Sequence, residues 1–294
     1  MLKAFTLVLV ALAQAASAPG PWSMAKLPDT SQSVASALNS GGTVTDAGRG
    51  LMWQQIDAGE MTWEDATLYA SALTLGGHHD WRLPTARELF NIFDHGRNPA
   101  LDPAVFPRTT AEYWWSSETL ASDPNRVWVT NSGGGIGPHP RSETLSAGGE
   151  KRFHVRCVRD LTTHAAAPPR PFAPNGDRTV TDLVTGLIWQ QDEAPADMTW
   201  DDAQAYARSL DLGSHRDWRM PTIKELQSIH DISRTNPAIN REAFPAAQAA
   251  EYWSSTTMFS RDSSRTWVID FRLGIGSYTA KTALRRIRCV RDGR

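Results

Sequence analysis

Two short stretches decide the fold: residues 80–85 read DWRLPT and residues 217–222 read DWRMPT. Each ends in a threonine that is followed three positions later by a glutamate. The two pairs are Thr85 with Glu88 and Thr222 with Glu225. This spacing predicts a capping box, in which each side chain satisfies a free backbone N–H at a helix N-terminus. The sequence therefore predicts a short helix directly after each stretch.

These stretches are part of a repeat that runs along the chain. The matched blocks are 44–46 with 180–182, 50–55 with 186–191, 61–66 with 198–203, and 156–160 with 288–292. The offset between copies rises from 136 to 139 and then falls to 132, so the first copy carries seven more residues between Gly137 and Arg156. Such self-similarity indicates one structural unit present twice.

The repeat divides the chain into two domains. We expect the first at residues 41–160 and the second at 177–294, each long enough to bury a core of its own. The segment 161–176 is rich in Ala and Pro and is predicted to be a semi-extended linker. Residues 19–40 match nothing in the second copy and are predicted to be a loose leader.

The N-terminus has the pattern of a secretory signal peptide, predicted at residues 1–18. Lys3 precedes an apolar run over residues 4–13, and small residues then allow cleavage after Ala15 or Ala18. The run is too short to span a bilayer, and no later segment is apolar enough to do so. The mature protein is therefore expected to be periplasmic or secreted, without a transmembrane segment.

Periodicity predicts the remaining elements coarsely. A hairpin is expected at residues 179–189, a helix at 63–73 after the cap Thr62, and short strands at 113–117, 127–130 and 153–158. Two strands, two helices and then several strands in each copy indicate an α+β fold.

Composition excludes several classes of function. The 294 residues carry 30 Lys and Arg against 32 Asp and Glu, so the chain lacks the basic excess of a nucleic-acid binder. Two cysteines exclude a disulfide framework and a paired CxxC zinc site. The histidines form no metal-binding pattern, and no nucleophile motif surrounds the serines. We therefore expect no metal, no cofactor and no enzymatic activity.

Several charged groups that resemble active-site clusters have a structural interpretation. The acidic pairs at 64–65 and 201–202 lie in the first turn of a helix, where the helix dipole stabilises negative charge. The DWR motif is interpreted as an ion pair that holds the loop before the second helix. The residues given this structural role are Asp80, Trp81, Arg82, Thr85, Glu88, Asp217, Trp218, Arg219, Thr222 and Glu225.

The motifs GLMWQ, TWEDA, DWRLPT, YWWSS and RCVRD together resemble the Lcl C-terminal domain family. The TWEDA and RLPT motifs are also similar to the formylglycine-generating, or sulfatase-modifying factor, family. Both resemblances imply a C-type-lectin-like fold. The first implies attachment to sulfated glycans and trimer formation; the second implies a copper site held by paired cysteines, but each copy here has only one cysteine.

The aromatic and basic residues supply the candidate binding sites. Tryptophans that recur in both copies are predicted to fill the core, whereas one member of the pair Trp114 and Trp115 is expected on the surface. The candidate ligand-binding residues are Trp115, Arg126, His139, Arg141, Arg265, Arg272 and Tyr278, chosen for their positions in loops and their polarity.

The expected function is an exported, non-catalytic binding protein whose partner is a glycan or a cell-surface protein. The alternatives are a structural component of a bacterial surface assembly and an oxidoreductase of the formylglycine-generating type. Cys157 and Cys289 are expected to be buried free thiols, although export leaves a disulfide between them open. The sequence leaves the oligomeric state open.

Overall fold

The computed structural model describes residues 36–107, 112–142, 149–162, 172–260 and 263–293. The predicted signal peptide and the leader up to residue 35 lie outside the described residues. Within the described ranges, no helix has the length and apolar character needed to cross a bilayer.

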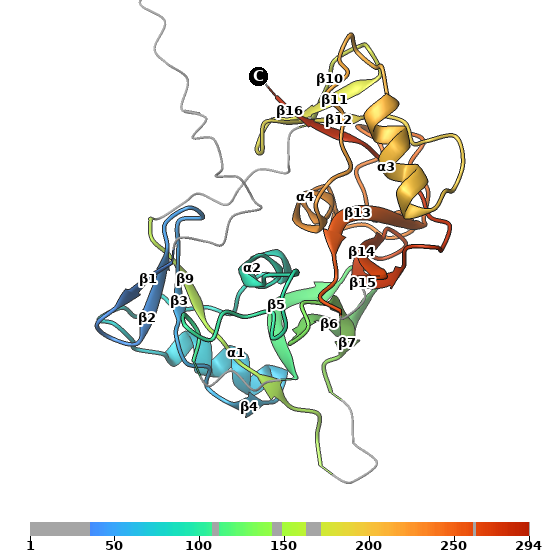
Figure 1. The fold of residues 1–294 in the computed structure, drawn as a ribbon. Helices are drawn as coiled ribbons and strands as arrows, with labels where there is room; N and C mark the ends of the chain where they lie inside the picture. The colour runs from blue at the N-terminus through green and yellow to red at the C-terminus, as the bar shows by residue number, and fades with distance from the viewer. Residues whose placement is uncertain (1–35, 108–111, 143–148, 163–171, 261–262, 294) are drawn as a thin grey trace, which may run out of the picture.

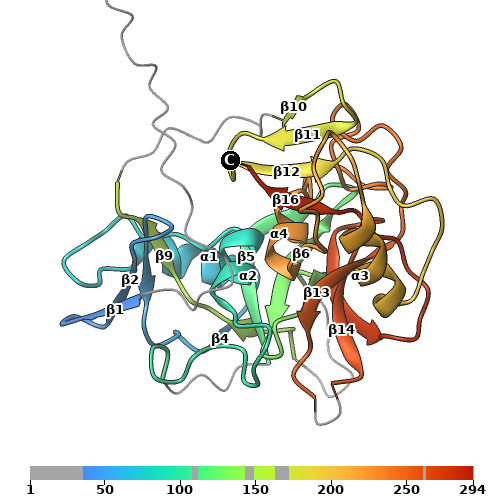
Figure 2. The same cartoon turned by 45° about the horizontal axis from the view of Figure 1, so that its top comes forward.

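Each copy contains an antiparallel sheet of four strands, ordered β1-β2-β3-β9 in the first and β10-β11-β12-β16 in the second. The two sheets lie far apart, with α2 and α4 between them (Figure 1, Figure 2). The predicted hairpin of the second copy is confirmed as β11 and β12. The bounds are β1 Ser36–Asn39, β2 Thr43–Asp46, β3 Leu51–Gln54, β9 Val158–Asp160, β10 Phe172–Pro174, β11 Thr179–Asp182, β12 Leu187–Gln190 and β16 Val290–Asp292.

The outermost strand of each sheet corrects the expected leader and linker. β1 lies in the segment predicted to be a leader and β10 in the segment predicted to be a linker, yet both pair with the first strand of the repeat. Asn39 Nδ2 donates to Thr43 Oγ1 at 3.0 Å, and Asn175 Nδ2 donates to Thr179 Oγ1 at 2.8 Å. The folded sheet of each copy therefore includes one strand that precedes the repeated sequence.

The four helices begin where the threonine caps predict. Both capping boxes are present: Glu88 N donates to Thr85 Oγ1 at 3.1 Å, and Glu225 N donates to Thr222 Oγ1 at 3.2 Å. Thr62 and Thr199 cap the longer helices by accepting from the backbone N–H groups of Asp65 and Asp202. The bounds are α1 Trp63–Ala72, α2 Ala86–Ile92, α3 Trp200–Ser209 and α4 Ile223–Ser228.

The two copies share a third sheet of eight strands, ordered β13-β14-β15-β7-β6-β5-β8-β4. The copies join where β15 pairs with β7, and Gly276 lies opposite Ile136 (Figure 1). A Cβ on Gly276 would lie 2.8 Å from Ile136 Cγ2, so the close approach of these strands requires glycine. The bounds are β4 Glu60–Met61, β5 Tyr113–Leu120, β6 Asp123–Asn131, β7 Ile136–Pro140, β8 Phe153–His154, β13 Glu251–Thr257, β14 Arg265–Asp270 and β15 Ile275–Ala280.

One hydrophobic cluster crosses this junction. Phe90 and Trp128 of the first copy pack in the same cluster as Leu226 and Trp267 of the second, and all are buried. The two copies are therefore packed against each other through a shared hydrophobic cluster. The fold is a sheet-rich α+β structure built from two repeated halves, as the order of elements predicts.

Two buried histidines face this junction from opposite sides. The ring of His95 lies 5.0 Å from that of Trp267, whose Nε1 donates to the His95 carbonyl oxygen at 2.9 Å. The ring of His230 lies 5.5 Å from that of Trp128. Burial lowers the pKa of both histidines to about 3, so both are neutral at neutral pH.

Candidate ligand-binding site

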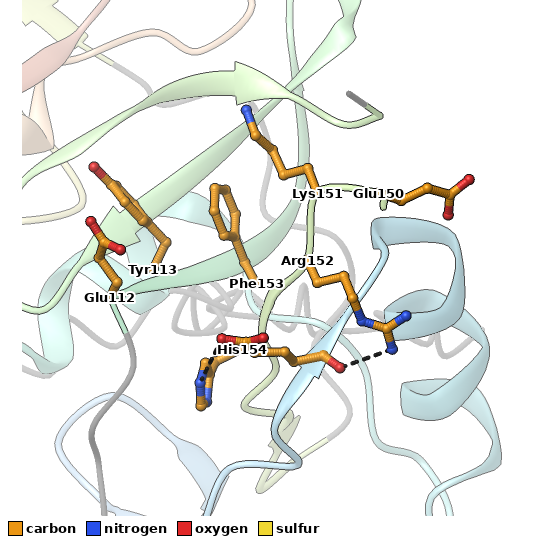
Figure 3. A pocket seen from close by; sticks show the side chains of 8 residues that line it. Glu112, Tyr113, Glu150, Lys151, Arg152, Phe153 and His154 are labelled. Atoms are coloured by element: carbon orange, nitrogen blue, oxygen red, sulfur yellow. Dashed lines mark hydrogen bonds and ion pairs between the residues drawn. The ribbon is translucent and has the colours of Figure 1, made fainter. Parts of the chain in front are cut away.

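The first copy has a surface hollow of about 370 Å³ at the edge of the eight-stranded sheet, where β8 meets β4 and β5 (Figure 3). This volume is at the lower end of the range for small-molecule sites. The residues that line the hollow are Glu60, Glu112, Tyr113, Glu150, Lys151, Arg152, Phe153 and His154.

β8 positions two of the side chains that line the hollow, Phe153 and His154. It pairs with β4 through Met61 opposite Phe153 and Glu60 opposite His154. Because neighbouring residues of a strand point to opposite faces, Phe153 and His154 take different surroundings. Phe153 packs on Trp115 with 4.5 Å between ring centroids, whereas His154 lies 6.4 Å from Trp114.

An aromatic group forms one side of the hollow. The rings of Tyr113 and Phe153 lie 4.9 Å apart at an interplanar angle of 31°, and the ring of His139 lies 4.9 Å from Tyr113. All three side chains are partly exposed. Figure 3 shows Phe153 between Tyr113 and Lys151, whose Nζ lies 5.8 Å from the Phe153 centroid. The arrangement offers a cluster of aromatic rings next to charged groups.

Polar contacts hold the opposite side. His154 Nδ1 lies 2.9 Å from Asp57 Oδ1, and its Nε2 lies 3.8 Å from Glu60 Oε1. Arg152 Nη2 donates to the Glu60 carbonyl oxygen at 3.1 Å. These contacts fix the backbone that carries Phe153, while the Glu60 side chain remains 63% exposed.

The second copy has different residues at the equivalent place. The indole N–H of Trp115 donates to the Met61 carbonyl, and that of Trp253 to the Met198 carbonyl, so these tryptophans are equivalent. By that alignment Tyr113 corresponds to Glu251, and the alignment of the two RCVRD motifs makes Arg285 the equivalent of Phe153. Glu251 and Arg285 form an ion pair. His154 and Glu60 likewise correspond to Arg286 and Asp197, paired at 2.8 Å. The aromatic surface of the first copy is thus replaced by paired charges.

The sequence-based prediction for Trp115 is wrong. Trp115 is 0% exposed and Trp114 is 1% exposed, so neither member of the pair lies on the surface. The alignment explains the error: Trp115 is the recurring core tryptophan, and Trp114 has Tyr252 as its equivalent. Trp115 therefore supports the hollow from beneath and is not positioned to touch a ligand.

Of the other candidates of the first copy, His139 contacts two residues that line the hollow, whereas the described contacts of Arg126 and Arg141 are with other residues. His139 belongs to the aromatic group described above. Arg141 lies over the Trp63 ring at 5.8 Å, and its Nε is 3.7 Å from Glu64. Arg126 Nη2 donates to the Pro138 carbonyl at 2.8 Å, which ties β6 to β7.

The candidates of the second copy lie on β14, β15 and the turn between them. Arg265 lies over the ring of Tyr278 at 5.5 Å, and Tyr278 is 43% exposed. Arg272 Nε lies 2.9 Å from Asp270. No contact within the described part of the chain joins these three residues to the hollow of the first copy.

Sequence reasoning missed Tyr113 and Phe153, which are the centre of the site. Two signals were available. The first is that the repeat fails at both positions, since Glu251 and Arg285 stand there in the second copy. The second is the seven-residue excess of the first copy, which lies between Gly137 and Arg156 and therefore includes the approach to β8.

The DWR motif has the structural role expected, with one different partner. Arg82 binds Glu88 at 2.8 Å and Asp160 at 3.2 Å, and these partners raise its pKa despite partial burial. Asp80 instead pairs with Arg159 of β9 at 2.7 Å, so the ion pair is not internal to the motif. The second copy repeats these ion pairs: Arg219 binds Glu225 and Asp292, and Asp217 binds Arg291. In both copies the tryptophan of the motif, Trp81 or Trp218, donates its indole N–H to a backbone carbonyl.

The two cysteines are free and fully buried. They belong to separate core clusters, one in each copy, and burial raises the pKa of each thiol to about 12. Neither is a thiolate at neutral pH. Among the described residues, no three His, Cys, Asp or Glu side chains gather closely enough to hold a metal ion.

Comparison with known proteins identifies the repeat. The Lcl C-terminal domain family matches residues 42–159 and again residues 178–291. A search of curated proteins found no match. Both matched regions contain the capped helices and most of the strands described above, and together they cover most of the chain. The chain therefore belongs to the Lcl C-terminal domain family, of which it contains two tandem copies.

Proposed function

We propose that this chain is an exported, non-catalytic binding protein that recognises a glycan through the hollow of its first copy, on a C-type-lectin-like fold. The observation that carries the proposal is the pair of partly exposed rings of Tyr113 and Phe153 beside charged side chains. A sugar ring has an apolar C–H face and polar hydroxyls. The C–H face would stack on the aromatic rings, and the hydroxyls would form hydrogen bonds with the carboxylates and basic groups around the rings.

The chemistry of the titratable groups supports binding over catalysis. The oxidoreductase alternative requires reactive cysteines, whereas Cys157 and Cys289 are buried thiols with pKa values near 12. His154 is held by Asp57 at 2.9 Å, which supports a positioning role for that carboxylate. Export rests on the signal-peptide pattern of residues 1–18 and places the ligand in the periplasm or outside the cell.

A glycan array tests the proposal directly. The mature protein is compared with the double variant Tyr113→Ala/Phe153→Ala and with Phe259→Ala, which removes an exposed aromatic ring of the second copy as a matched control. We expect specific hits that survive moderate salt, that the control retains, and that the double variant loses. Absence of hits at low and moderate salt would reject glycan recognition and favour a protein partner or a structural role.

A further inference from the structure

We infer that the hollow of the first copy, and not the equivalent place in the second, holds a protonated amino group carried on a sugar ring. The ligand would then be a glycan that contains an amino sugar with a free amine. This inference rests on the proposed function, because it names the class of glycan that the same hollow recognises.

The chain itself places an ammonium group at this position. Lys151 Nζ lies 5.8 Å from the centroid of Phe153, within the range at which the negative face of an aromatic ring attracts a cation. Figure 3 shows the Lys151 side chain extending alongside the Phe153 ring. An amine on a ligand that stacks on Phe153 would therefore compete with Lys151 for the same ring.

The charges around the rings also favour a cation. Three carboxylates line the hollow, from Glu60, Glu112 and Glu150, against two permanent cations, Lys151 and Arg152. Arg152 is already bound to a backbone carbonyl at 3.1 Å. Glu112 lies next to Tyr113 in Figure 3, so a carboxylate is available where a stacked ring would present its substituents. An amine there would gain a charge-assisted hydrogen bond in addition to the contact with the rings.

The second copy lacks both features. Where the first copy has Tyr113 and Phe153, the second has Glu251 paired with Arg285, and its Arg286 binds Asp197 at 2.8 Å. Its carboxylates are therefore neutralised by its own arginines, and no ring stands at either equivalent position. One binding site per chain follows, in spite of the duplicated domain.

The test uses the mature full-length chain and two defined probes, the β-1,4-linked tetramers of glucosamine and of N-acetylglucosamine. The two differ at nitrogen, since acetylation removes the charge. Calorimetric titration at a pH where the amine is protonated gives affinity and stoichiometry. We expect one site per chain and an affinity about tenfold higher for glucosamine, from a cation–ring contact combined with a partly exposed ion pair.

Substitutions in the hollow test the roles of Lys151 and of the two rings separately. Lys151→Met removes the competing cation and should tighten glucosamine binding about two- to fivefold, the range set by exposed cation–ring contacts. Lys281→Met is the matched control, because Lys281 Nζ lies 4.0 Å over the Trp200 ring of the second copy. Tyr113→Glu/Phe153→Arg copies the residues of the second copy and should abolish binding, while an unchanged unfolding midpoint shows that the fold is kept.

The inference is overturned by equal affinity for the two tetramers, by weaker binding of Lys151→Met, or by two sites per chain. It is also overturned if neither tetramer binds. In that case, hits for other glycans on the array would leave the proposed function standing, whereas an array without hits would reject both.

Discussion

The guanidinium carbon of Arg156 lies 4.6 Å from the ring centroid of Phe106, and both side chains are buried. Arg156 Nη1 donates to the carbonyl of Gln54 at 2.8 Å and also to that of Gln55, while Nη2 lies 3.6 Å from Asp57. The second copy repeats the arrangement, with Arg288 at 4.6 Å from Phe244. In each copy, the buried arginine thus connects the backbone carbonyls at the end of the first hairpin to the hydrophobic core.

Removal of this arginine should destabilise the protein strongly. In Arg156→Met the carbonyls of Gln54 and Gln55 lose a charged donor, and the carboxylate of Asp57 loses its arginine and keeps only its contacts with His154 and Gly59 among those described. Loss of one member of a buried ion pair costs about 3–5 kcal/mol. The free energy of unfolding from chemical denaturation checks this. A loss below about 1 kcal/mol would show that the arginine is dispensable, and Arg288→Met provides the matched measurement in the second copy.

The capping boxes allow a milder and quantitative test. Thr85→Ala and Thr222→Ala each remove the oxygen that accepts from a backbone N–H, and each should cost about 1 kcal/mol. Thr85→Ser retains that oxygen and serves as the control. Because the two caps belong to different copies, the double variant should lose close to the sum. A stability of Thr85→Ala equal to that of Thr85→Ser would contradict the role of the cap.

Gly274 tests the packing at the junction between the copies. Its φ is +95°, and a Cβ there would lie 2.0 Å from His230 Nε2, so Gly274→Ala adds a clash to the backbone strain. Gly77 also has a positive φ of +80° but has no atom within 4 Å of its virtual Cβ. Gly77→Ala should cost about 1 kcal/mol and Gly274→Ala about 3 kcal/mol or more. An equal loss of stability in the two variants, measured by thermal unfolding, would show that the His230 side chain moves aside without cost.

The buried histidines predict a loss of stability in acid. Their pKa is about 3 in the folded protein and about 6.5 in an unfolded chain, so between these values only the unfolded state binds the proton. Stability is therefore fully present above about pH 6.5 and falls as the pH drops toward 3. Lys224 beside His95, and Arg87 beside His230, disfavour the protonated forms further.

The substitution His95→Gln isolates this effect. The drop in unfolding free energy between about pH 7 and about pH 5 should be smaller by about 2 kcal/mol in His95→Gln than in the unmodified protein. The control is His79→Gln, the same substitution at an exposed histidine. An identical pH dependence in all three proteins would place the acid sensitivity elsewhere, in the carboxylates.

Local features were the most predictable from sequence. Threonine caps and recurring tryptophans depend on contacts within a few residues or within one core. The structure confirms the caps, and it confirms burial of the recurring tryptophans except Trp63 and Trp200, which are partly exposed. The shared sheet was not foreseen, because the pairing of β7 with β15 depends on how the two copies associate. Gly276 permits the close approach of these two strands, but a glycine at this position in the sequence indicates only a turn. The strands β1 and β10 were missed because their sequences, SALN and FAP, share little.

The candidate site was only partly predictable for a related reason. The residues that the two copies share are those that maintain the fold. Tyr113 and Phe153 differ between the copies, and they come together only because β8 pairs beside β5 in the folded sheet. His139 was singled out for its position and does lie in the aromatic group, although that group could not be assembled without the strand pairing.

The most direct test of this account is calorimetric titration with the highest-affinity glycan of the array, performed on the mature protein and on Tyr113→Glu/Phe153→Arg. The account predicts saturable binding at one site per chain for the mature protein and no measurable binding for the variant, with both proteins folded. Binding of equal affinity in the two proteins would contradict it, since recognition would then occur away from the hollow.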